Sequence, residues 1–212
     1  MLIAGAGGHA IELLNEINSL ANSIAFFDDV NIYKKPIKFN YYPILQNEKE
    51  VRRFLNKNEE FCLGVGNPFI RYKLNTKLSS LGGKLVSIIS TKANIGNLEN
   101  AFGVGINIMT GATITSCINI DDGSLIHINS SIHHNSRIGK FCEISPGARI
   151  LGNVTIGDFS SVGSNATILP NIKIGNNVII GAGSVINKNI PDNCLVVGVP
   201  GKIIKEIIPL IF

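Results

Sequence analysis

The chain contains the segment Ile126-His-Ile-Asn-Ser-Ser-Ile132-His-His-Asn-Ser-Arg-Ile138-Gly-Lys-Phe-Cys-Glu-Ile144, in which isoleucine recurs at every sixth residue. The residue two places before each isoleucine is mostly small, and Asn or Gly mostly lies three places after it. Because Asn and Gly tolerate positive φ with the least strain, these positions are expected to be corners. The same spacing gives fourteen successive aliphatic positions: Ile108, Ile114, Ile120, Ile126, Ile132, Ile138, Ile144, Ile150, Ile156, Val162, Ile168, Ile174, Ile180 and Ile186.

A six-residue repeat of a short strand and a corner predicts a parallel β-helix. Each hexad forms one face of a triangular prism, so three hexads complete a coil and the aliphatic column fills the core. The fourteen hexads make about four and a half coils. Pro191 ends the period because it cannot donate to a strand ladder. The apolar tail at residues 203–212 is expected to cap the β-helix or pack on it.

The chain before about Leu85 alternates between short apolar strands and helical patterns. Such alternation predicts a small parallel sheet covered by helices. We expect strands at 2–4, 24–27, 61–65 and 84–89, helices at 11–20, 49–55 and 70–81, and only a weak pattern at 33–46. The domain boundaries are therefore placed at 1–90 for the α/β domain and 91–212 for the β-helix with its tail.

The composition excludes several classes of protein. The 212 residues are 45% hydrophobic and only 16% charged, which indicates a folded chain. The net charge of +4 comes from basic residues spread thinly along the chain, which argues against a nucleic-acid-binding face. Residues 101–120 carry no charge but are too rich in polar and β-branched side chains for a membrane span. Four widely spaced cysteines and the lack of a signal-peptide pattern favour the cytoplasm.

A glycine-rich turn, Gly5-Ala-Gly-Gly-His-Ala10, follows the first strand and precedes the first helix. With Asp28 at the end of the second strand, it matches the fingerprint of a nucleotide-binding fold. Backbone N–H groups of the turn would receive phosphate, and the carboxylate would bind ribose. The alternative is a turn required only for close helix packing. His9 either contacts the phosphate or merely starts the helix, and the domain is too short for a second nucleotide half.

Three of the four histidines are His127, His133 and His134. A spacing of six puts His127 and His133 on different faces of the prism, so no metal site is expected within the chain. His134 follows an outward position, and Gly152 lies one coil further along the same column. This pair fits a general base beside a backbone N–H that stabilises an oxyanion. The alternative is an ordinary surface histidine.

Several segments resemble the bacterial sugar O/N-acetyltransferases, which include sialic-acid O-acetyltransferases and UDP-4-amino-sugar N-acetyltransferases. In the repeat region they are residues 131–147, Leu151-Gly-Asn-Val-Thr-Ile-Gly157 and Gly181-Ala-Gly-Ser-Val185. In the first domain they are the glycine turn, Phe26-Phe-Asp-Asp29 and Gly64-Val-Gly-Asn-Pro-Phe-Ile-Arg71. The resemblance implies a Rossmann-like nucleotide-sugar-binding domain followed by a left-handed parallel β-helix. It also implies acetyl-CoA as co-substrate, no metal, and a homotrimer with its active sites between subunits.

The resemblance also assigns residues to the site. His134 matches the catalytic base, and Asn135 stands where the family usually has an acidic residue. Residues implied in acetyl-CoA binding are Glu143, Gly152, Ser164, Ala182 and Lys202. Residues implied in nucleotide-sugar binding are Gly7, Gly8, His9, Asp28, Asp29 and Asn67.

Three positions depart from the family pattern. Asn135 is a weaker partner for an imidazolium than a carboxylate would be. Glu143 replaces a common histidine near the thioester and, nine residues from His134, is a candidate for the missing acid. His127 replaces a common asparagine near the acceptor.

The expected function is acetyl-CoA-dependent acetylation of an amino group on a nucleotide-activated amino sugar, of the UDP-4-amino-sugar type, in bacterial surface-glycan biosynthesis. One alternative is O-acetylation of sialic acid or another sugar hydroxyl. A second is a non-catalytic, nucleotide-binding trimeric scaffold, and a third is an NAD oxidoreductase. Phe141 and Phe159, at corners otherwise held mostly by Asn or Gly, are candidate trimer contacts, unless they fold inward.

Overall fold

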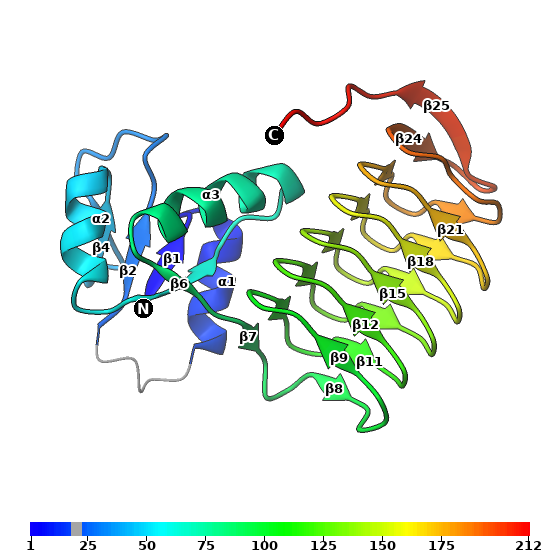
Figure 1. Cartoon of the computed structure of the whole chain (residues 1–212), viewed down its shortest axis with the longest axis horizontal. Helices are drawn as coiled ribbons and strands as arrows, with labels where there is room; N and C mark the ends of the chain where they lie inside the picture. The colour runs from blue at the N-terminus through cyan, green and yellow to red at the C-terminus, as the bar shows by residue number, and fades with distance from the viewer. Residues whose placement is uncertain (18–22) are drawn as a thin grey trace.

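The computed structural model describes residues 1–17 and 23–212. It shows an α/β domain beside a triangular prism of stacked coils (Figure 1). Residues 18–20, the last three of the helix expected at 11–20, lie outside the described residues.

The sheet of the α/β domain has the strand order β3-β4-β2-β1-β5-β6. All neighbouring strands are parallel except β3 and β4, which form an antiparallel edge pair. The expected parallel sheet is therefore confirmed, and the weakly patterned stretch at 33–46 adds an edge hairpin to it. The strands are β1 (Leu2–Ala4), β2 (Ala25–Phe27), β3 (Ile37–Lys38), β4 (Tyr42–Leu45), β5 (Glu60–Leu63) and β6 (Lys84–Leu85).

Helices cover both faces of this sheet. They are α1 (Gly8–Glu16), α2 (Glu48–Leu55) and α3 (Pro68–Ser80). Leu2 and Ala4 of β1 belong to the apolar cluster that contains residues of α2 and α3, whereas Ile3 belongs to the cluster that contains residues of α1. This division follows from the alternation of side chains along a strand. Asn47 and Asn67 cap α2 and α3, since each side chain accepts a backbone N–H of the first helical turn.

The β-helix consists of three sheets, one for each face of the prism. The eight-stranded sheet contains β7 (Ile88–Ile89), β10 (Asn107–Ile108), β13 (Leu125–Ile126), β16 (Glu143–Ile144), β19 (Ser161–Val162), β22 (Ile179–Ile180), β24 (Cys194–Val197) and β25 (Lys202–Glu206). The six-stranded sheet contains β8 (Asn94–Ile95), β11 (Thr113–Ile114), β14 (Ser131–Ile132), β17 (Arg149–Ile150), β20 (Thr167–Ile168) and β23 (Val185–Ile186). The five-stranded sheet contains β9 (Ala101–Phe102), β12 (Asn119–Ile120), β15 (Arg137–Ile138), β18 (Thr155–Ile156) and β21 (Lys173–Ile174).

The sequence repeat maps directly onto this architecture. Each of the fourteen aliphatic residues is the second residue of a strand from β10 to β23, and all fourteen are buried. The thirteen corner residues from Gly111 to Gly183 adopt positive φ, including the three that are neither Asn nor Gly: Cys117, Phe141 and Phe159. The predicted left-handed parallel β-helix is therefore confirmed, with Ile, Val, Ala, Cys and Ser side chains alternating through the core.

The β-helix begins earlier than expected. Residues 84–89 do not form one strand, because β6 pairs with β5 in the α/β domain whereas β7 pairs with β10 in the β-helix. Strands β7, β8 and β9 make a first coil that the sequence count missed, since the six-residue spacing is broken between Ile95 and Phe102. The first strand of the prism thus lies before residue 91, the expected start of the second domain.

Aromatic residues join the two domains. The Phe141 and Phe159 rings stack with their centroids 5.6 Å apart, and both lie edge-on to Tyr72 of α3. Phe212 of the tail lies 5.1 Å from Phe159 and 5.3 Å from Tyr72, centroid to centroid. The two phenylalanines are therefore contacts between domains of one chain, which corrects their interpretation as trimer contacts. These contacts outweigh the strain of positive φ at a bulky residue.

The tail packs on the β-helix and also returns to the first domain. Strand β25 pairs antiparallel with β24, and the C-terminus then runs back toward α3 (Figure 1). The uncharged stretch at 101–120 forms β9 to β12. Among the described residues, no helix has the length and apolar character that crossing a membrane requires.

Candidate active site

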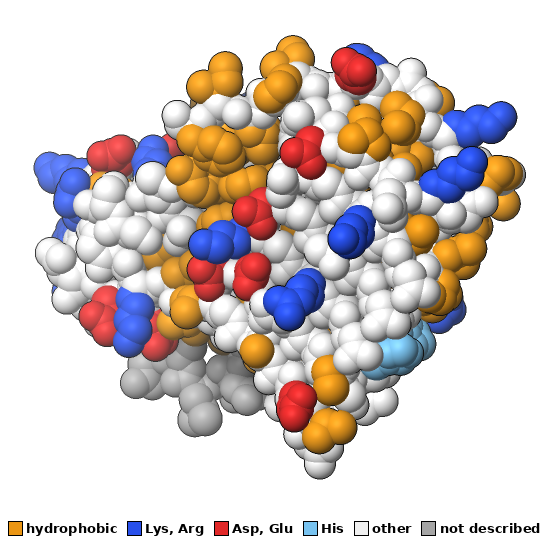
Figure 2. All heavy atoms as spheres, turned by 45° about the vertical axis from the view of Figure 1, so that its right-hand side comes forward, with side chains coloured by type: hydrophobic (Ala, Val, Ile, Leu, Met, Phe, Trp, Pro, Cys, Tyr) orange, Lys and Arg blue, Asp and Glu red, His pale blue; other side chains and the backbone are white. Residues whose placement is uncertain are grey.

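His134 and Gly152 lie directly over one another on the surface of the β-helix. His134 is exposed and follows β14, and its carbonyl oxygen accepts the N–H of Asn153 at 2.9 Å. A Cβ atom added at Gly152 would fall on the His134 ring. The predicted column is thus confirmed, and glycine is required at 152 if the imidazole is to keep this position. Figure 2 shows exposed histidine side chains gathered at one edge of the prism.

Asn135 is the polar neighbour of the imidazole. Its side-chain nitrogen lies 3.3 Å from Nδ1 of His134, and its φ of 60° is that of a corner residue. Rotation of the amide about its last torsion would present the oxygen to Nδ1–H and leave Nε2 as the proton acceptor. Within residues 1–17 and 23–212, His134 forms no ion pair with a carboxylate.

Glu143 lies on a different face of the prism from His134. It begins β16 in the eight-stranded sheet, and its carboxylate lies against Gly66 in the loop before α3. Burial raises the pKa of Glu143, although a hydrogen bond from Ser145 and the charge of Arg71 oppose this shift. The expectation that Glu143 supplies an acid to His134 of the same chain is therefore wrong.

Ser164 and Ala182 form a second stacked pair. The N–H of Gly183 donates to the carbonyl oxygen of Ser164 at 2.9 Å, so the two corners lie one coil apart. They follow β19 and β22 of the eight-stranded sheet, whereas His134 and Gly152 follow strands of the six-stranded sheet. Lys202 is exposed at the start of β25. The structure thus places the predicted acetyl-CoA residues at separate corners of one chain.

The glycine turn contains glycines of two kinds. Gly5 has a φ of 115°, and a Cβ there would lie 2.8 Å from the carbonyl oxygen of Gly64, so close packing explains this position. Gly7 and Gly8 are exposed, and a Cβ at either would meet no atom within 4 Å. The packing alternative therefore accounts for Gly5 but not for Gly7 and Gly8, where open space lies at the N-terminus of α1.

The carboxylate of Asp28 is already engaged within its own loop. It accepts the backbone N–H groups of Val30 and Asn31, the side-chain amide of Asn31, and the Tyr33 hydroxyl at 2.6 Å. Burial alone would raise the pKa of Asp28, but these hydrogen bonds outweigh it and lower the pKa. A ribose hydroxyl would have to replace one of these side-chain partners.

The other two predicted polar residues of this edge also have partners. Asp29 accepts a hydrogen bond from Lys77 at 2.6 Å, and Asn67 caps α3 by accepting the N–H of Ile70. Both residues lie at the carboxyl ends of parallel strands, the edge where ligands of α/β sheets bind.

Sequence reasoning missed a polar cluster between the domains. The rings of His9 on α1 and His127 after β13 have their centroids 5.0 Å apart, and Glu12 approaches both. Burial, followed by the charge of Arg71, lowers the pKa of His9 to about 3 and that of His127 to about 4. No sequence motif could reveal this contact, because the two histidines come from separate domains.

Arg71 lies beside this cluster and is fully buried. Its guanidinium donates to the carbonyl oxygens of Leu63 and Val65 in the first domain. It also donates to the carbonyl oxygen of Gly123 and the side-chain oxygen of Asn107 in the β-helix. One side chain thereby ties the loop that follows β5 to the eight-stranded sheet.

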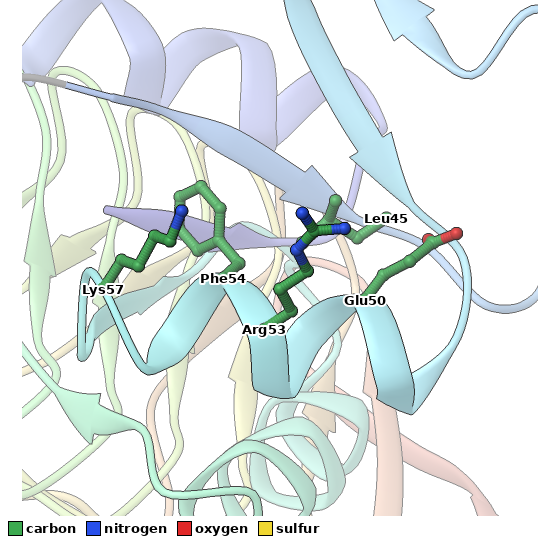
Figure 3. A pocket seen from close by; sticks show the side chains of 5 residues that line it. All are labelled: Leu45, Glu50, Arg53, Phe54 and Lys57. Carbon is green, nitrogen blue, oxygen red and sulfur yellow. The ribbon is translucent and has the colours of Figure 1, made fainter.

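Two hollows lie away from the predicted site residues. One, of about 290 Å³, lies between β4 and α2 and is lined by Leu45, Glu50, Arg53, Phe54 and Lys57 (Figure 3). The other, of about 450 Å³, lies where α3 meets the β-helix, beside Tyr72 and the two corner phenylalanines. Neither contains a residue that the sequence assigned to the site.

Two family models match parts of the chain. Residues 1–78 match the PglD N-terminal domain, and residues 153–188 match the bacterial transferase hexapeptide (six repeats). A PglD-type first domain joined to bacterial transferase hexapeptide repeats indicates an acyltransferase.

Solved structures resemble the chain over nearly its whole length. PerB from Caulobacter crescentus, in complex with CoA and GDP-perosamine, is 26% identical over 95% of both chains with a TM-score of 0.85. The acetyltransferase domain of PglB from Neisseria gonorrhoeae, in complex with acetyl coenzyme A, is 28% identical over 96% of this chain and 98% of that one, with a TM-score of 0.86. WeeI from Acinetobacter baumannii is 26% identical over 96% and 98%, with a TM-score of 0.84.

These findings confirm the resemblance to the bacterial sugar acetyltransferases. The chain is an acyltransferase with a PglD-type first domain and a hexapeptide β-helix.

Proposed function

We propose that the chain transfers the acetyl group of acetyl-CoA to the amino group of a nucleotide-activated amino sugar, of the UDP-4-amino-sugar type, in bacterial surface-glycan biosynthesis. The observation that carries this proposal is the exposed His134 imidazole stacked on Gly152. The complexes of PerB with CoA and GDP-perosamine and of PglB with acetyl coenzyme A support the two substrate classes. We place the reaction in the cytoplasm, where free cysteines such as these four persist.

In the proposed reaction, Nε2 of His134 takes a proton from the amino group as its nitrogen attacks the thioester carbonyl. The Gly152 N–H donates to the oxyanion of the tetrahedral intermediate. Among the described residues, no group accepts a hydrogen bond from this N–H. The carbon–sulfur bond then breaks, the amide product forms, and the CoA thiolate receives the proton from the imidazolium.

The proposed active enzyme is a homotrimer. His134 and Gly152 occupy one corner of the prism, whereas Ser164 and Ala182 occupy another. This separation supports a site to which a second copy of the chain contributes. In the trimer, the corner with Ser164 and Ala182 of a neighbouring copy would lie beside the corner with His134 and Gly152. The active site would then lie between subunits.

The nucleotide would lie at the carboxyl edge of the α/β sheet, which faces the β-helix. The open backbone at Gly7 and Gly8, at the N-terminus of α1, would receive the diphosphate. Asp28, Asp29 and Asn67 stand at the same edge and would contact the nucleotide by exchanging partners. His9 adjoins the turn, but both of its ring nitrogens are buried.

The test is release of CoA thiol from acetyl-CoA with a panel of UDP- and GDP-linked amino sugars, free sialic acid and CMP-sialic acid. Turnover with an amino-sugar nucleotide supports the proposal. Turnover confined to sialic acid would replace it with O-acetylation. No turnover with any of these acceptors, from a preparation of trimers, would contradict it.

Gly7→Val is expected to leave the fold intact and weaken nucleotide-sugar binding. The backbone of Gly7 is extended, with a φ of −85°, and the space around it is open. We expect KM for the sugar nucleotide to rise about tenfold or more, because the side chain fills the space in which a phosphate would approach the helix N-terminus. Steady-state kinetics with each substrate varied checks this. An equal rise in KM for acetyl-CoA would contradict the assignment.

Asn135→Asp is expected to increase kcat by about 3- to 10-fold, since a charged acceptor stabilises the imidazolium by roughly 1 kcal/mol more than an amide. Aspartate also tolerates the φ of 60° at this corner. Asn129→Asp is the matched control, because Asn129 has a φ of 54° at the neighbouring corner. The assay is acetyl transfer at saturating substrates. Equal stimulation by both variants would show that the effect is not specific to His134.

A further inference from the structure

The cluster of His9, Glu12 and His127 has the arrangement of a set of metal ligands. His9 and Glu12 lie three residues apart on α1, and His127 follows β13 on the facing sheet. One ligand atom from each residue lies within 4.8 Å of the other two. The three residues therefore converge on one point from two domains.

The distances in the cluster are those of co-ligands rather than of hydrogen bonds. Oε2 of Glu12 lies 3.5 Å from Nδ1 of His9 and 3.9 Å from Nδ1 of His127. Both separations exceed the usual hydrogen-bond range of about 2.7–3.2 Å. Ligands held about 2.0–2.2 Å from a tetrahedral zinc ion lie roughly 3.3 Å from one another. A small contraction of the cluster would bring all three atoms to bonding distance.

Three of the four ring nitrogens of the cluster lack a hydrogen-bond partner among the described residues. Both nitrogens of His9 and Nδ1 of His127 are buried, and none forms a hydrogen bond within the described part of the chain. Buried polar atoms are nearly always satisfied in native proteins. Only one nitrogen of an imidazole can face a given ligand, so one nitrogen of His9 and Nδ1 of His127 are the two buried atoms that an additional ligand at this point would satisfy.

The donor atoms of the cluster, two imidazole nitrogens and a carboxylate oxygen, suit a metal ion better than an anion. A phosphate would meet two uncharged rings and the Glu12 carboxylate, which repels it. The nearby guanidinium of Arg71 already donates to four oxygen atoms, so it is engaged by protein groups rather than by an anion in the cluster.

We propose that His9, Glu12 and His127 bind one zinc ion that joins the α/β domain to the β-helix. Two imidazole nitrogens and a carboxylate oxygen form a donor set typical of zinc. The repeat spacing predicts no metal site, because His127 and His133 lie on different faces of the β-helix. The missing partners come from α1, more than a hundred residues earlier.

The test is zinc binding by the full-length chain after treatment with EDTA, without acetyl-CoA or sugar. We expect one zinc per chain by equilibrium dialysis, and visible absorption of the cobalt form typical of a site with nitrogen and oxygen ligands. Saturating zinc is expected to raise Tm by about 5–10 °C, since only the folded chain offers the site. Glu12→Gln and His127→Ala are expected to weaken zinc binding about 100-fold or more.

His133→Ala is the matched control, because His133 follows the neighbouring strand β14 and is no member of the cluster. It is expected to bind zinc as the wild type does. The Glu12 side chain is half-exposed, and glutamine keeps its shape, so Glu12→Gln is expected to fold. It therefore tests the zinc site even if His127→Ala does not fold. The proposal would be overturned if Glu12→Gln and His127→Ala bound zinc with wild-type stoichiometry and affinity. It would also be overturned if the wild type bound no zinc at 100 micromolar, a concentration about ten to a hundred times the Kd expected of a working site. Because this binding test uses neither acetyl-CoA nor a sugar, its result is separate from that of the acetyl-transfer assay.

Discussion

His134→Ala is expected to reduce kcat for acetyl transfer by about 10²- to 10⁴-fold, the usual contribution of a positioned general base. The side chain is exposed and stacks on Gly152. Its removal therefore breaks no packing in the core, and Tm and oligomeric state should stay within error of the wild type. KM for both substrates should change little, because in the proposed mechanism the imidazole acts on the proton rather than on ground-state binding.

His133→Ala is the control for this variant. His133 directly precedes His134 on the same corner and is more covered, so a loss caused by general disturbance of the corner would affect both variants alike. Activity assays at saturating substrates, with size-exclusion chromatography, separate the two cases. Retention of more than about a tenth of wild-type kcat in His134→Ala would exclude the residue as the base.

The β-helix was predictable because its determinant is local and repeated. Each hexad contains its own strand, its inward aliphatic residue and its corner, so fourteen consecutive repeats leave no competing period. Strand order follows from the same arithmetic, since three hexads return the chain to the same face. The stacking of Gly152 on His134 was predicted in this way and is confirmed.

The errors occur where contacts between domains override local pattern. Phe141 and Phe159 accept positive φ because Tyr72 of α3 packs against both rings. The segment at 84–89 reads as one strand, yet the passage from one domain to the next divides it between two sheets. No period in the sequence encodes either event.

The candidate site, like the fold, was predictable within each domain but not at the junction between the domains. Residues of the β-helix columns could be located by counting, and the glycine turn was recognisable by its position between a strand and a helix. The side chains at the junction could not be placed, because His127, Glu143 and Arg71 take their neighbours from the other domain. The sequence also did not reveal that Asp28 is engaged within its own loop, where Asn31 and Tyr33 donate hydrogen bonds to its carboxylate.

Arg71→Ala is expected to destabilise the protein by roughly 3–5 kcal/mol, as the loss of one partner from a buried charged network usually does. The guanidinium is fully buried and donates to four oxygen atoms at 2.6–3.0 Å, two in each domain. Alanine leaves these acceptors without donors and opens a cavity between the domains. Thermal unfolding should shift by about 10 °C or more for a chain of this size.

The loss should be concentrated at the domain junction rather than spread over the chain. The guanidinium donates hydrogen bonds to the β-helix at Asn107 and Gly123. Hydrogen exchange should therefore accelerate in the loop after β5 and at α3 while most coils stay protected. Arg53→Ala is the control, because Arg53 is an exposed arginine on α2 and its loss should change stability by less than about 0.5 kcal/mol. Equal Tm values for the two variants would show that the four hydrogen bonds do not hold the domains together. If the Tm of Arg71→Ala falls as expected, the rate of acetyl transfer should fall as well. The reason is that the glycine turn would no longer be held at a fixed position relative to the β-helix.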